Sequence, residues 1–529
     1  MTNHHNSHSL VRGAVLLTLA GLFSKVLSAG YRIPLQNIAG DLGFYIYQQV
    51  YPILGMTLIL SLYGFPVAIS KLVSEIKEQN QSLSFSSFYI PAFTWLMGIC
   101  FVIFILGYTE AKRIAAVMGD VKLVSSLKAA FFVFLFLPFT SLFRGVYQGL
   151  NNMQPTAVTQ VAEQLVRVSV IILTAVYVVK GGSIYHLGIG AAAGSILGSL
   201  VSILILGYFL RKDQIWTKAR WESFSVSYLK TILFYGLFIC FNYMLLLMLQ
   251  LVDSLTLVPH LIESGMEQEA AKIYKGIFDR GQPLIQLGTV LASSIALALI
   301  PSVTRKKLKE KQTEVHGYIF AAVKFSFLLA LGAAVGLIVL FPEINQLFFQ
   351  DSEGTSALRL FMVIILFSSL AITTSSVLQG LGRVTHTALL VAAGVVIKWG
   401  ANLLLIPIYQ LHGAALASIL AAAVVMTGNL ILLNKDFHVI KWLDLPWFSA
   451  VVSIGGMGIS LIAMKEILPV SVFLDHRFSL LVYTLAMTGI GALIYLLILL
   501  RLGALSNREL EALPKGRWLI RLLPKGMRE

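Results

Sequence analysis

Eight ionisable residues fall within or at the ends of long apolar segments of the sequence. The cations are Lys25, Arg32, Arg167, Arg280 and Lys398, and the anions are Glu163, Asp253 and Asp279. A charge at hydrocarbon depth costs about 2.5 kcal/mol or more by insertion scales, so each of these side chains must face a cavity or a partner. In membrane proteins such residues mark the path of a polar substrate or ion.

The cations outnumber the anions five to four when Asp41, in an adjoining loop, is counted with the anions. Arginine presents paired donors that match phosphate oxygens, and lysine presents a point charge. We therefore predict a cavity that binds an anionic, phosphate-containing substrate, with binding residues Lys25, Arg32, Arg167, Asp279, Arg280 and Lys398. Proton antiport would instead need several buried carboxylates.

Spacing separates local pairs from groups that need distant partners. Glu163 and Arg167 are four residues apart on one helix face, so they are expected to pair. Asp279 and Arg280 are adjacent and point in different directions, so they are not expected to neutralise each other.

Two further interpretations stay open for the remaining polar groups. Arg32 and Asp253 lie near span ends, where snorkelling of the side chain to the interface is the competing interpretation. Glu163, Asp253 and Asn402 are candidates for a coupling ion or an internal partner.

The sequence contains none of the motifs that carry catalysis. It has no helical pair of metal-binding histidines, no Gly-x-Ser-x-Gly, and no phosphate-binding glycine loop that ends in Lys-Ser/Thr. We therefore expect no enzymatic activity, no cofactor and no metal ion. With no nucleotide site, an ion gradient, the membrane potential or the substrate gradient would drive transport.

The elements that position these residues are predicted to be membrane-spanning helices. Of the 529 residues 57% are hydrophobic and 12% are charged, against roughly 25% charged in soluble domains. The apolar runs reach the roughly 20 residues that a spanning helix needs. The fold class is all-α and polytopic, with about fourteen spans near 11–36, 45–70, 89–108, 124–145, 155–179, 187–210, 227–252, 277–303, 317–341, 357–380, 384–408, 412–434, 446–464 and 478–501.

Lysine and arginine concentrate in alternate loops, which predicts the orientation. The rich set includes Lys71 and Lys77, Arg144, and the clusters at 211–220, 305–311, 435–441 and 501–528, whereas Asp and Glu dominate 263–269 and 343–353. The positive-inside rule then places both termini in the cytoplasm of a multi-pass cell-membrane protein. The net charge of +15 accordingly indicates anionic lipid and not nucleic acid.

The chain repeats itself with a shift of 231 residues. Val146-x-Gln148-Gly149-Leu150 returns as Val377-x-Gln379-Gly380-Leu381, Thr156-Ala157 returns as Thr387-Ala388, and Arg167 falls on Lys398. With a shorter shift, Gly190-Ala191-Ala192-x-x-Ser195 matches Gly413-Ala414-Ala415-x-x-Ser418. Small residues such as Gly190, Gly194 and Gly198 allow close helix packing. The Asp279-Arg280 pair is not duplicated, because it falls on Gln48 and Gln49.

The repeat predicts two pseudo-symmetric six-helix lobes with an unrepeated addition. The boundaries are an N-lobe at 1–212, an inter-lobe linker at 213–226, a C-lobe at 227–436, two extra helices at 437–502 and a basic tail at 503–529. Such lobes are expected to be related by an axis along the membrane normal.

Several short motifs, in order along nearly the whole chain, resemble those of the multidrug/oligosaccharidyl-lipid/polysaccharide (MOP) exporter superfamily. Within it the chain is most similar to the polysaccharide-biosynthesis group, which includes proteins of the stage V sporulation protein B type and the MurJ type of lipid II flippase. The motifs are Phe23-Ser24-Lys25-Val26-Leu27, Ile38-Ala39-Gly40, Gly64-Phe65-Pro66-Val67-Ala68-Ile69-Ser70-Lys71, Phe278-Asp279-Arg280 and Leu299-Ile300-Pro301-Ser302.

The resemblance implies alternating access and export of a lipid-linked sugar, with the two extra helices forming a groove for the lipid tail. The family's cation positions map onto Lys25, near Arg32 (at Tyr31), and onto Asp279 and Arg280. Two positions depart from the pattern: the span-2 arginine aligns near Met56 and Thr57, and the acidic residue of span 11 has no counterpart beside Lys398 and Asn402.

The leading functional prediction is a flippase for a polyprenyl-pyrophosphate-linked saccharide, such as a peptidoglycan precursor or another cell-wall unit. Its expected partners are the lipid-linked oligosaccharide and membrane lipids, and the chain is expected to be a monomer. A multidrug or cation antiporter of the same superfamily is the alternative, which the central cations disfavour. A membrane scaffold for wall synthesis that transports nothing is the third class.

Overall fold

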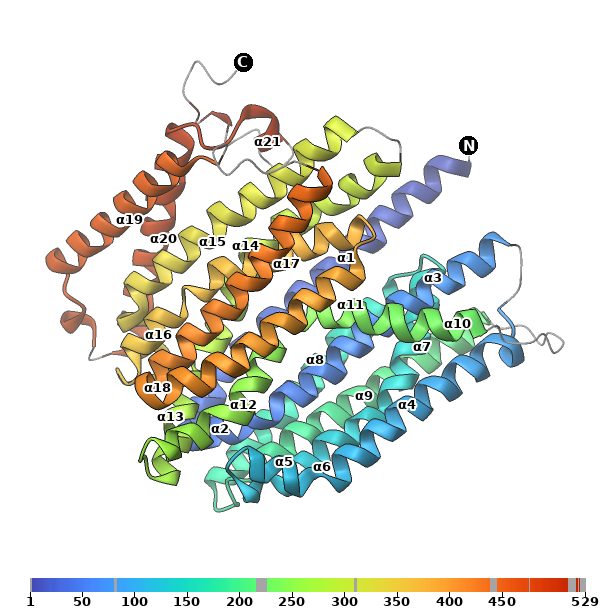
Figure 1. Cartoon of the computed structure of the whole chain (residues 1–529), viewed down its shortest axis with the longest axis horizontal. Helices are drawn as coiled ribbons and strands as arrows, with labels where there is room; N and C mark the ends of the chain where they lie inside the picture. Colours follow the sequence, from blue (N-terminus) through green and yellow to red (C-terminus); the bar gives the residue numbers. More distant parts are fainter. Residues whose placement is uncertain are drawn as a thin grey trace. The chain divides into compact units, whose positions relative to one another are not determined.

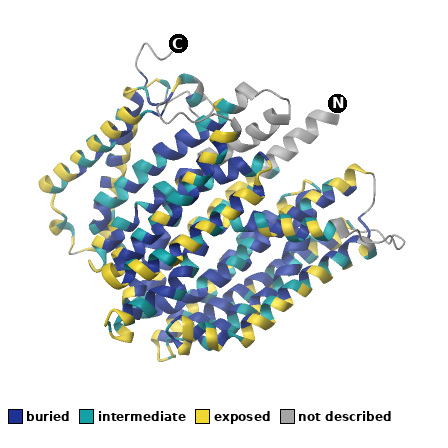
Figure 2. Ribbon diagram, viewed as in Figure 1, coloured by how far each residue is buried: buried dark blue, intermediate teal, exposed yellow. Residues whose placement is uncertain are grey.

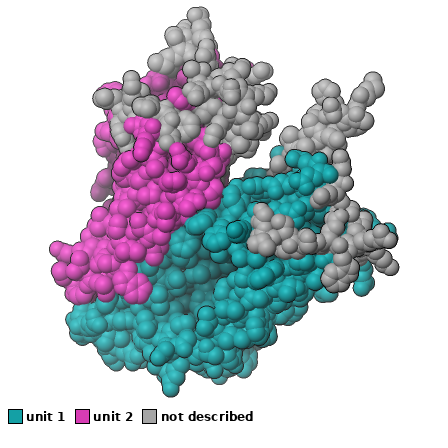
Figure 3. Space-filling view, turned by 45° about the vertical axis from the view of Figure 1, so that its right-hand side comes forward, with its two compact units in different colours: residues 1–279 teal, residues 280–529 magenta. Residues whose placement is uncertain are grey.

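The computed structural model describes residues 2–79, 83–215, 226–308, 312–437, 445–474, 476–511, 520–521 and 523, and the regular structure of these residues is helical. Helices satisfy every backbone polar group within one segment, as a lipid environment demands. The chain divides into two compact units, Met1–Asp279 and Arg280–Glu529 (Figure 3).

Unit 1 contains the first thirteen α-helices and several short helical turns (Figure 1). Its elements are α1 (Thr2–Gly30), α2 (Arg32–Ile59), η1 (Leu60–Gly64), α3 (Phe65–Glu78), η2 (Phe85–Tyr89), α4 (Ile90–Thr109), α5 (Ala111–Val117), η3 (Val121–Leu123), α6 (Val124–Phe132), η4 (Val133–Phe136), α7 (Leu137–Gly149), α8 (Gln154–Val179), α9 (His186–Asp213), α10 (Val226–Lys230), η5 (Thr231–Tyr235), α11 (Gly236–Tyr243), α12 (Leu245–Glu263) and α13 (Gln268–Asp279).

Unit 2 contains the remaining helices. They are α14 (Gly281–Leu308), α15 (Gln312–Phe349), α16 (Thr355–Phe361), α17 (Ile364–Gly380), α18 (Val384–Phe437), α19 (Trp447–Ile467), η7 (Val470–Phe473), α20 (Arg477–Arg501) and α21 (Asn507–Glu511).

The described helices accommodate the fourteen expected crossings. Eleven stretches are long and apolar enough to cross a membrane, and two of them, Val15–Glu78 and Val384–Lys435, have 64 and 52 residues. A crossing takes about 20 residues, so each of these two suffices for a pair of crossings. The 28 residues of α14 supply the last one. The predicted all-α polytopic fold is confirmed.

The two long stretches bend at residues with left-handed backbone conformations. Gly40 has φ 66° and ψ −178°, a region open essentially to glycine alone. Gln410 has φ 49° inside α18. Each bend lies between two predicted spans, so one long helical stretch can contain both of them.

Many of the positions that are exposed on the helices (Figure 2) carry large apolar side chains. Leu204 is 73% exposed and Phe448 is 74% exposed. An apolar surface that extends along many helices would be unfavourable in contact with water, and it is typical of helices in a lipid bilayer.

The glycines of α9 allow that helix to pack closely on α8. A Cβ on Gly194 would lie 2.9 Å from the carbonyl oxygen of Arg167, and one on Gly198 would lie 2.8 Å from that of Glu163. Packing therefore explains the small-residue spacing, as predicted. This close packing against α9 fixes the backbone of α8 at Glu163 and Arg167, two of the predicted site residues.

In unit 2, helices α19 and α20 are fastened to α15 by polar contacts. Lys465 pairs with Glu343 at 2.7 Å, and Tyr495 donates to the carbonyl of Leu328 at 2.7 Å. A third contact joins the end of the chain to α15, where Glu509 of α21 pairs with Lys324 at 2.9 Å. The unrepeated helices are thus bound firmly to one helix of the repeated part.

The compact units do not coincide with the lobes expected from the repeat. The expected N-lobe, 1–212, lies inside unit 1, whereas the expected C-lobe, 227–436, is divided at Asp279 because α12 and α13 pack on α2. The lobe boundaries stay a prediction. Most of the expected linker, 216–225, and much of the basic tail lie outside the described residues.

Candidate anion-binding site

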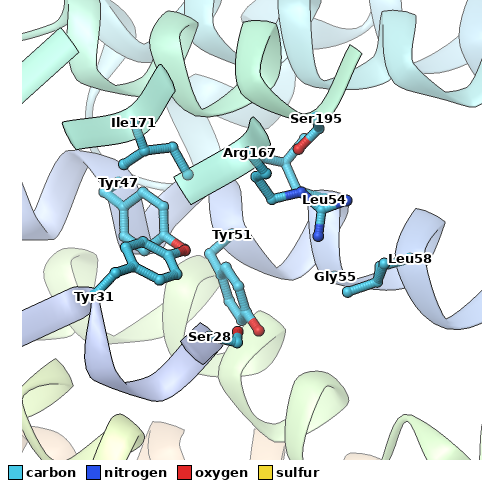
Figure 4. A pocket seen from close by; sticks show the side chains of 10 residues that line it. All are labelled: Ser28, Tyr31, Tyr47, Tyr51, Leu54, Gly55, Leu58, Arg167, Ile171 and Ser195. Carbon is cyan, nitrogen blue, oxygen red and sulfur yellow. The ribbon is translucent and has the colours of Figure 1, made fainter. Parts of the chain in front are cut away.

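A small cavity of about 10 Å³ lies inside unit 1. Residues of four predicted spans line it, those near 11–36, 45–70, 155–179 and 187–210. Figure 4 shows its ten side chains, contributed by α1, α2, α8 and α9 and by Tyr31 between the first two helices. Its polar residues include Ser28, Tyr51, Arg167 and Ser195. A space of this size holds about one water molecule, so a larger ligand requires the helices to separate.

Arg32 is fully buried beside this cavity without a hydrogen-bond acceptor. None of its three guanidinium nitrogens has a hydrogen-bond partner among the residues that the structure describes. The guanidinium carbon lies 4.0 Å from the ring centroid of Tyr51, which lines the cavity. A cation–π contact of this kind contributes about 2 kcal/mol in a desolvated site. This stacking energy compensates only part of the cost of burying the guanidinium.

Three tyrosines line the cavity, namely Tyr31 just before α2 and Tyr47 and Tyr51 in the second half of that helix. The hydroxyls of Tyr31 and Tyr47 are hydrogen-bonded to each other, and the rings of Tyr47 and Tyr51 have centroids 5.7 Å apart. Tyrosine hydroxyls can donate to phosphate or sugar oxygens while their ring faces contact apolar groups. Within this cluster, Tyr51 provides the ring on which the guanidinium of Arg32 stacks.

Arg167 and Glu163 pair on α8, as their spacing predicted. The Nη2 atom of Arg167 lies 2.6 Å from Oε1 of Glu163, and Nη1 donates to Gln164 at 3.2 Å. The Nε atom of Arg167 has no hydrogen-bond partner among the described residues. Arg167 therefore reaches the cavity with part of its donor capacity unused.

Arg144 does not lie in a cytoplasmic loop as its position in the sequence predicts. It is fully buried on α7, inside a stretch that is long and apolar enough to cross a membrane. Its Nη2 lies 2.8 Å from Oε2 of Glu163, and its guanidinium also donates to Ser61, Thr159 and Ser202. The error arose because Arg144 falls at the predicted end of a span, where a loop cation and an inward-facing one look alike.

The other predicted residues of unit 1 lie in different surroundings. Lys25 is partly exposed on α1, and Asp253 is buried on α12. Asp279 is buried and accepts from Lys275 at 2.5 Å. Asp279 and Arg280 thus have separate partners, as predicted.

In unit 2 the predicted cations are satisfied internally. Arg280 forms a two-point ion pair with Asp351, at 2.6 and 2.8 Å. Lys398 is fully buried and donates to the Ser418 hydroxyl at 2.6 Å and to the Ala414 carbonyl at 2.9 Å. Asn402 is buried one helical turn further on.

The repeat is visible in these contacts. Ser195 and Ser418 correspond in the sequence repeat, as do Arg167 and Lys398. Arg167 and Ser195 line one cavity, and Lys398 contacts Ser418 directly. Each copy therefore places a cation near the corresponding serine, although of the two pairs only Lys398 and Ser418 form a direct hydrogen bond in the described part of the chain.

A second buried ion pair in unit 1 was not predicted. Asp120, just before η3, pairs with Lys272 of α13 at 2.9 Å, and it accepts from Tyr185 at 2.8 Å. Burial, and then this hydrogen bond, raise the pKa of Tyr185. Asp120, Tyr185 and Lys272 belong to three segments that are far apart in the sequence. No local sequence pattern could have predicted their contact.

Comparisons with known proteins agree on one family. Residues 10–307 match the family model described as polysaccharide biosynthesis protein. The uncharacterized membrane protein YabM of Bacillus subtilis is 39% identical over 98% of this chain and 97% of its own length. The lipid II flippase MurJ of the same organism is 26% identical over 97% and 99%.

Solved structures show the same fold. A lipid II flippase MurJ in an inward closed conformation aligns with a TM-score of 0.63 and 17% identity over 92% of this chain and 98% of that one. An inward-facing multidrug resistance MATE family transporter of the MOP superfamily aligns with a TM-score of 0.65 and 17% identity over 78% and 94%.

Proposed function

Because the chain belongs to the polysaccharide biosynthesis protein family of the MOP exporter superfamily, we propose that it is a flippase for a polyprenyl-pyrophosphate-linked saccharide. The saccharide is a peptidoglycan precursor of the lipid II kind or another cell-wall unit. In this proposal the protein lies in the cell membrane with both termini in the cytoplasm, consistent with its loop charges.

The observation that carries the proposal is the state of Arg32. A fully buried guanidinium with three nitrogens that lack acceptors among the described residues is costly, and membrane proteins retain such groups where they serve a ligand. A pyrophosphate supplies the missing acceptors in the geometry that arginine fits best.

Arg167 contributes a second cation, which lines the cavity beside Arg32. The ligand would bind between Arg32 on α2 and Arg167 on α8, beside the tyrosine cluster. The isoprenoid tail would stay in the bilayer along α19 and α20, whose outer faces are apolar, as Phe448 and Ile459 illustrate. Lys25, Asp279, Arg280 and Lys398 remain proposed contacts along the substrate path.

The test is translocation of a fluorescent polyprenyl-pyrophosphate disaccharide in proteoliposomes. Purified protein is expected to make the inner-leaflet pool accessible to an external quencher, and R32M protein is expected not to. An absence of translocation by wild-type protein, together with export of ethidium, would support a cation antiporter instead. Complementation of a strain depleted of its lipid II flippase would identify the saccharide as a peptidoglycan precursor.

A further inference from the structure

Arg144, Glu163 and Arg167 form one connected group within unit 1. The two oxygens of Glu163 are divided between the arginines, Oε2 to Arg144 at 2.8 Å and Oε1 to Arg167 at 2.6 Å. All three side chains are at most 10% exposed. Two cations and one anion give the group a net charge of +1, which acts at low local dielectric.

Because the Glu163 carboxylate is shared between two arginines, it neutralises the charge of Arg167 only in part. Only Arg167 of the three lines the cavity, and Arg144 lies behind it, held by Ser61, Thr159 and Ser202. Without Arg144, Glu163 would neutralise Arg167 alone. With Arg144 present, the three residues together retain one uncompensated positive charge.

The second copy of the repeat has different residues at the three corresponding positions. Under the 231-residue shift, Arg144, Glu163 and Arg167 correspond to Ser375, Gly394 and Lys398. Lys398 is fully buried and donates to the Ala414 carbonyl and the Ser418 hydroxyl. Both copies therefore place a buried cation at this position of the repeat, although its neighbours differ.

We propose that Arg144 sets the charge of the anion site, as a positioning residue that acts through Glu163 and does not touch the ligand. The inference rests on the proposed function, because it assigns Arg167 to a site for a polyvalent phosphate. A site that keeps this charge favours a pyrophosphate over a monophosphate.

The experiment is a charge cycle on full-length protein in detergent, with binding of farnesyl pyrophosphate measured by calorimetry. E163Q raises the charge of the group by one and is expected to bind about tenfold more tightly, because opposite charges attract more strongly at the low effective dielectric constant of a buried site. R144M lowers the charge by one and is expected to bind about tenfold more weakly. The double variant R144M/E163Q restores the charge and is expected to bind like wild type.

Two controls separate charge from structure. R144K keeps the charge but loses the forked hydrogen bonds, and it is expected to bind like wild type. E110Q makes the same charge change at a half-exposed surface pair and is expected to leave binding unchanged.

The two single variants change affinity in opposite directions, so either one tests the proposal if the other does not fold. E163Q binding no more tightly than wild type, or R144K binding as weakly as R144M, would overturn the charge-setting role. Wild-type protein that binds farnesyl pyrophosphate no better than farnesol would instead refute the proposed function. A wild-type preference for farnesyl pyrophosphate over farnesyl monophosphate that R144M abolishes is the expected result.

Discussion

Replacing Arg32 with methionine is expected to stabilise the protein and to weaken ligand binding. The guanidinium is fully buried and its nitrogens have no hydrogen-bond partner among the described residues. An unsatisfied buried polar group costs about 1–3 kcal/mol, and stacking on Tyr51 recovers about 2 kcal/mol. Methionine fills a similar volume without a charge and adapts to irregular space.

The expected gain in stability is that of comparable substitutions, because a buried charge costs more than a buried neutral polar group. Replacement of buried charges by apolar side chains stabilises proteins by about 1–4 kcal/mol in favourable cases. For a unit of this size about 1 kcal/mol shifts the melting temperature by about 2 °C, so R32M is expected to melt about 2–8 °C higher. The lost charged hydrogen bonds, about 1.5–3 kcal/mol, predict a tenfold to hundredfold weaker affinity for farnesyl pyrophosphate.

Arg144 provides the matched control, since it is equally buried and has five contacts to oxygen atoms. R144M removes one partner of a buried ion pair, which destabilises by about 3–5 kcal/mol. The same substitution is thus expected to change the melting temperature in opposite directions at the two sites. Thermal unfolding in detergent, followed by tryptophan fluorescence, gives the first measurement, and calorimetry gives the second.

Two results would refute the reasoning about Arg32. A lower melting temperature for R32M would mean that the guanidinium stabilises the ligand-free protein. A higher melting temperature with unchanged affinity would mean that Arg32 is costly but does not contact the ligand.

Three other substitutions test separate parts of the molecule. Arg280→Ala is expected to abolish translocation in proteoliposomes with little loss of stability, because its partner Asp351 is 35% exposed and can be solvated; normal translocation would contradict this. Asp120→Asn is expected to cost about 3–5 kcal/mol by leaving Lys272 buried and unneutralised, and thermal unfolding should show that the further change Lys272→Met recovers part of the loss. Gly40→Ala is expected to lower stability by about 1–3 kcal/mol because alanine disfavours this backbone conformation, and an unchanged melting temperature would show that the bend is not required.

The fold could be predicted from the sequence because hydrophobic length and charge alternation act locally. The length of each apolar run predicts a membrane-spanning helix without information from the rest of the chain. The glycine spacing of α9 likewise indicates close packing without identifying the partner helix. The pairing of Glu163 with Arg167 was predictable for the same reason, since the two lie one turn apart.

The rest of the site depends on contacts between distant segments. Arg144 and Glu163 are 19 residues apart, on helices whose relative rotation no single-helix pattern determines. Lys272 and Asp120 are separated by the entire stretch from η3 to α13. Asp351 was expected in an outer loop, and its two-point pair with Arg280 could not be read from either residue alone. A buried charge predicts that a partner exists, but it does not predict which partner.

The walls of the cavity differ in how readily they can move apart. The wall formed by α8 and α9 is held by backbone contacts at Gly194 and Gly198, so separating these helices would forfeit close packing along several turns. The opposite wall, α1 and α2, has a turn at Tyr31 and a left-handed bend at Gly40. Because the closed cavity has room for about one water molecule, a pyrophosphate can enter only when one wall yields.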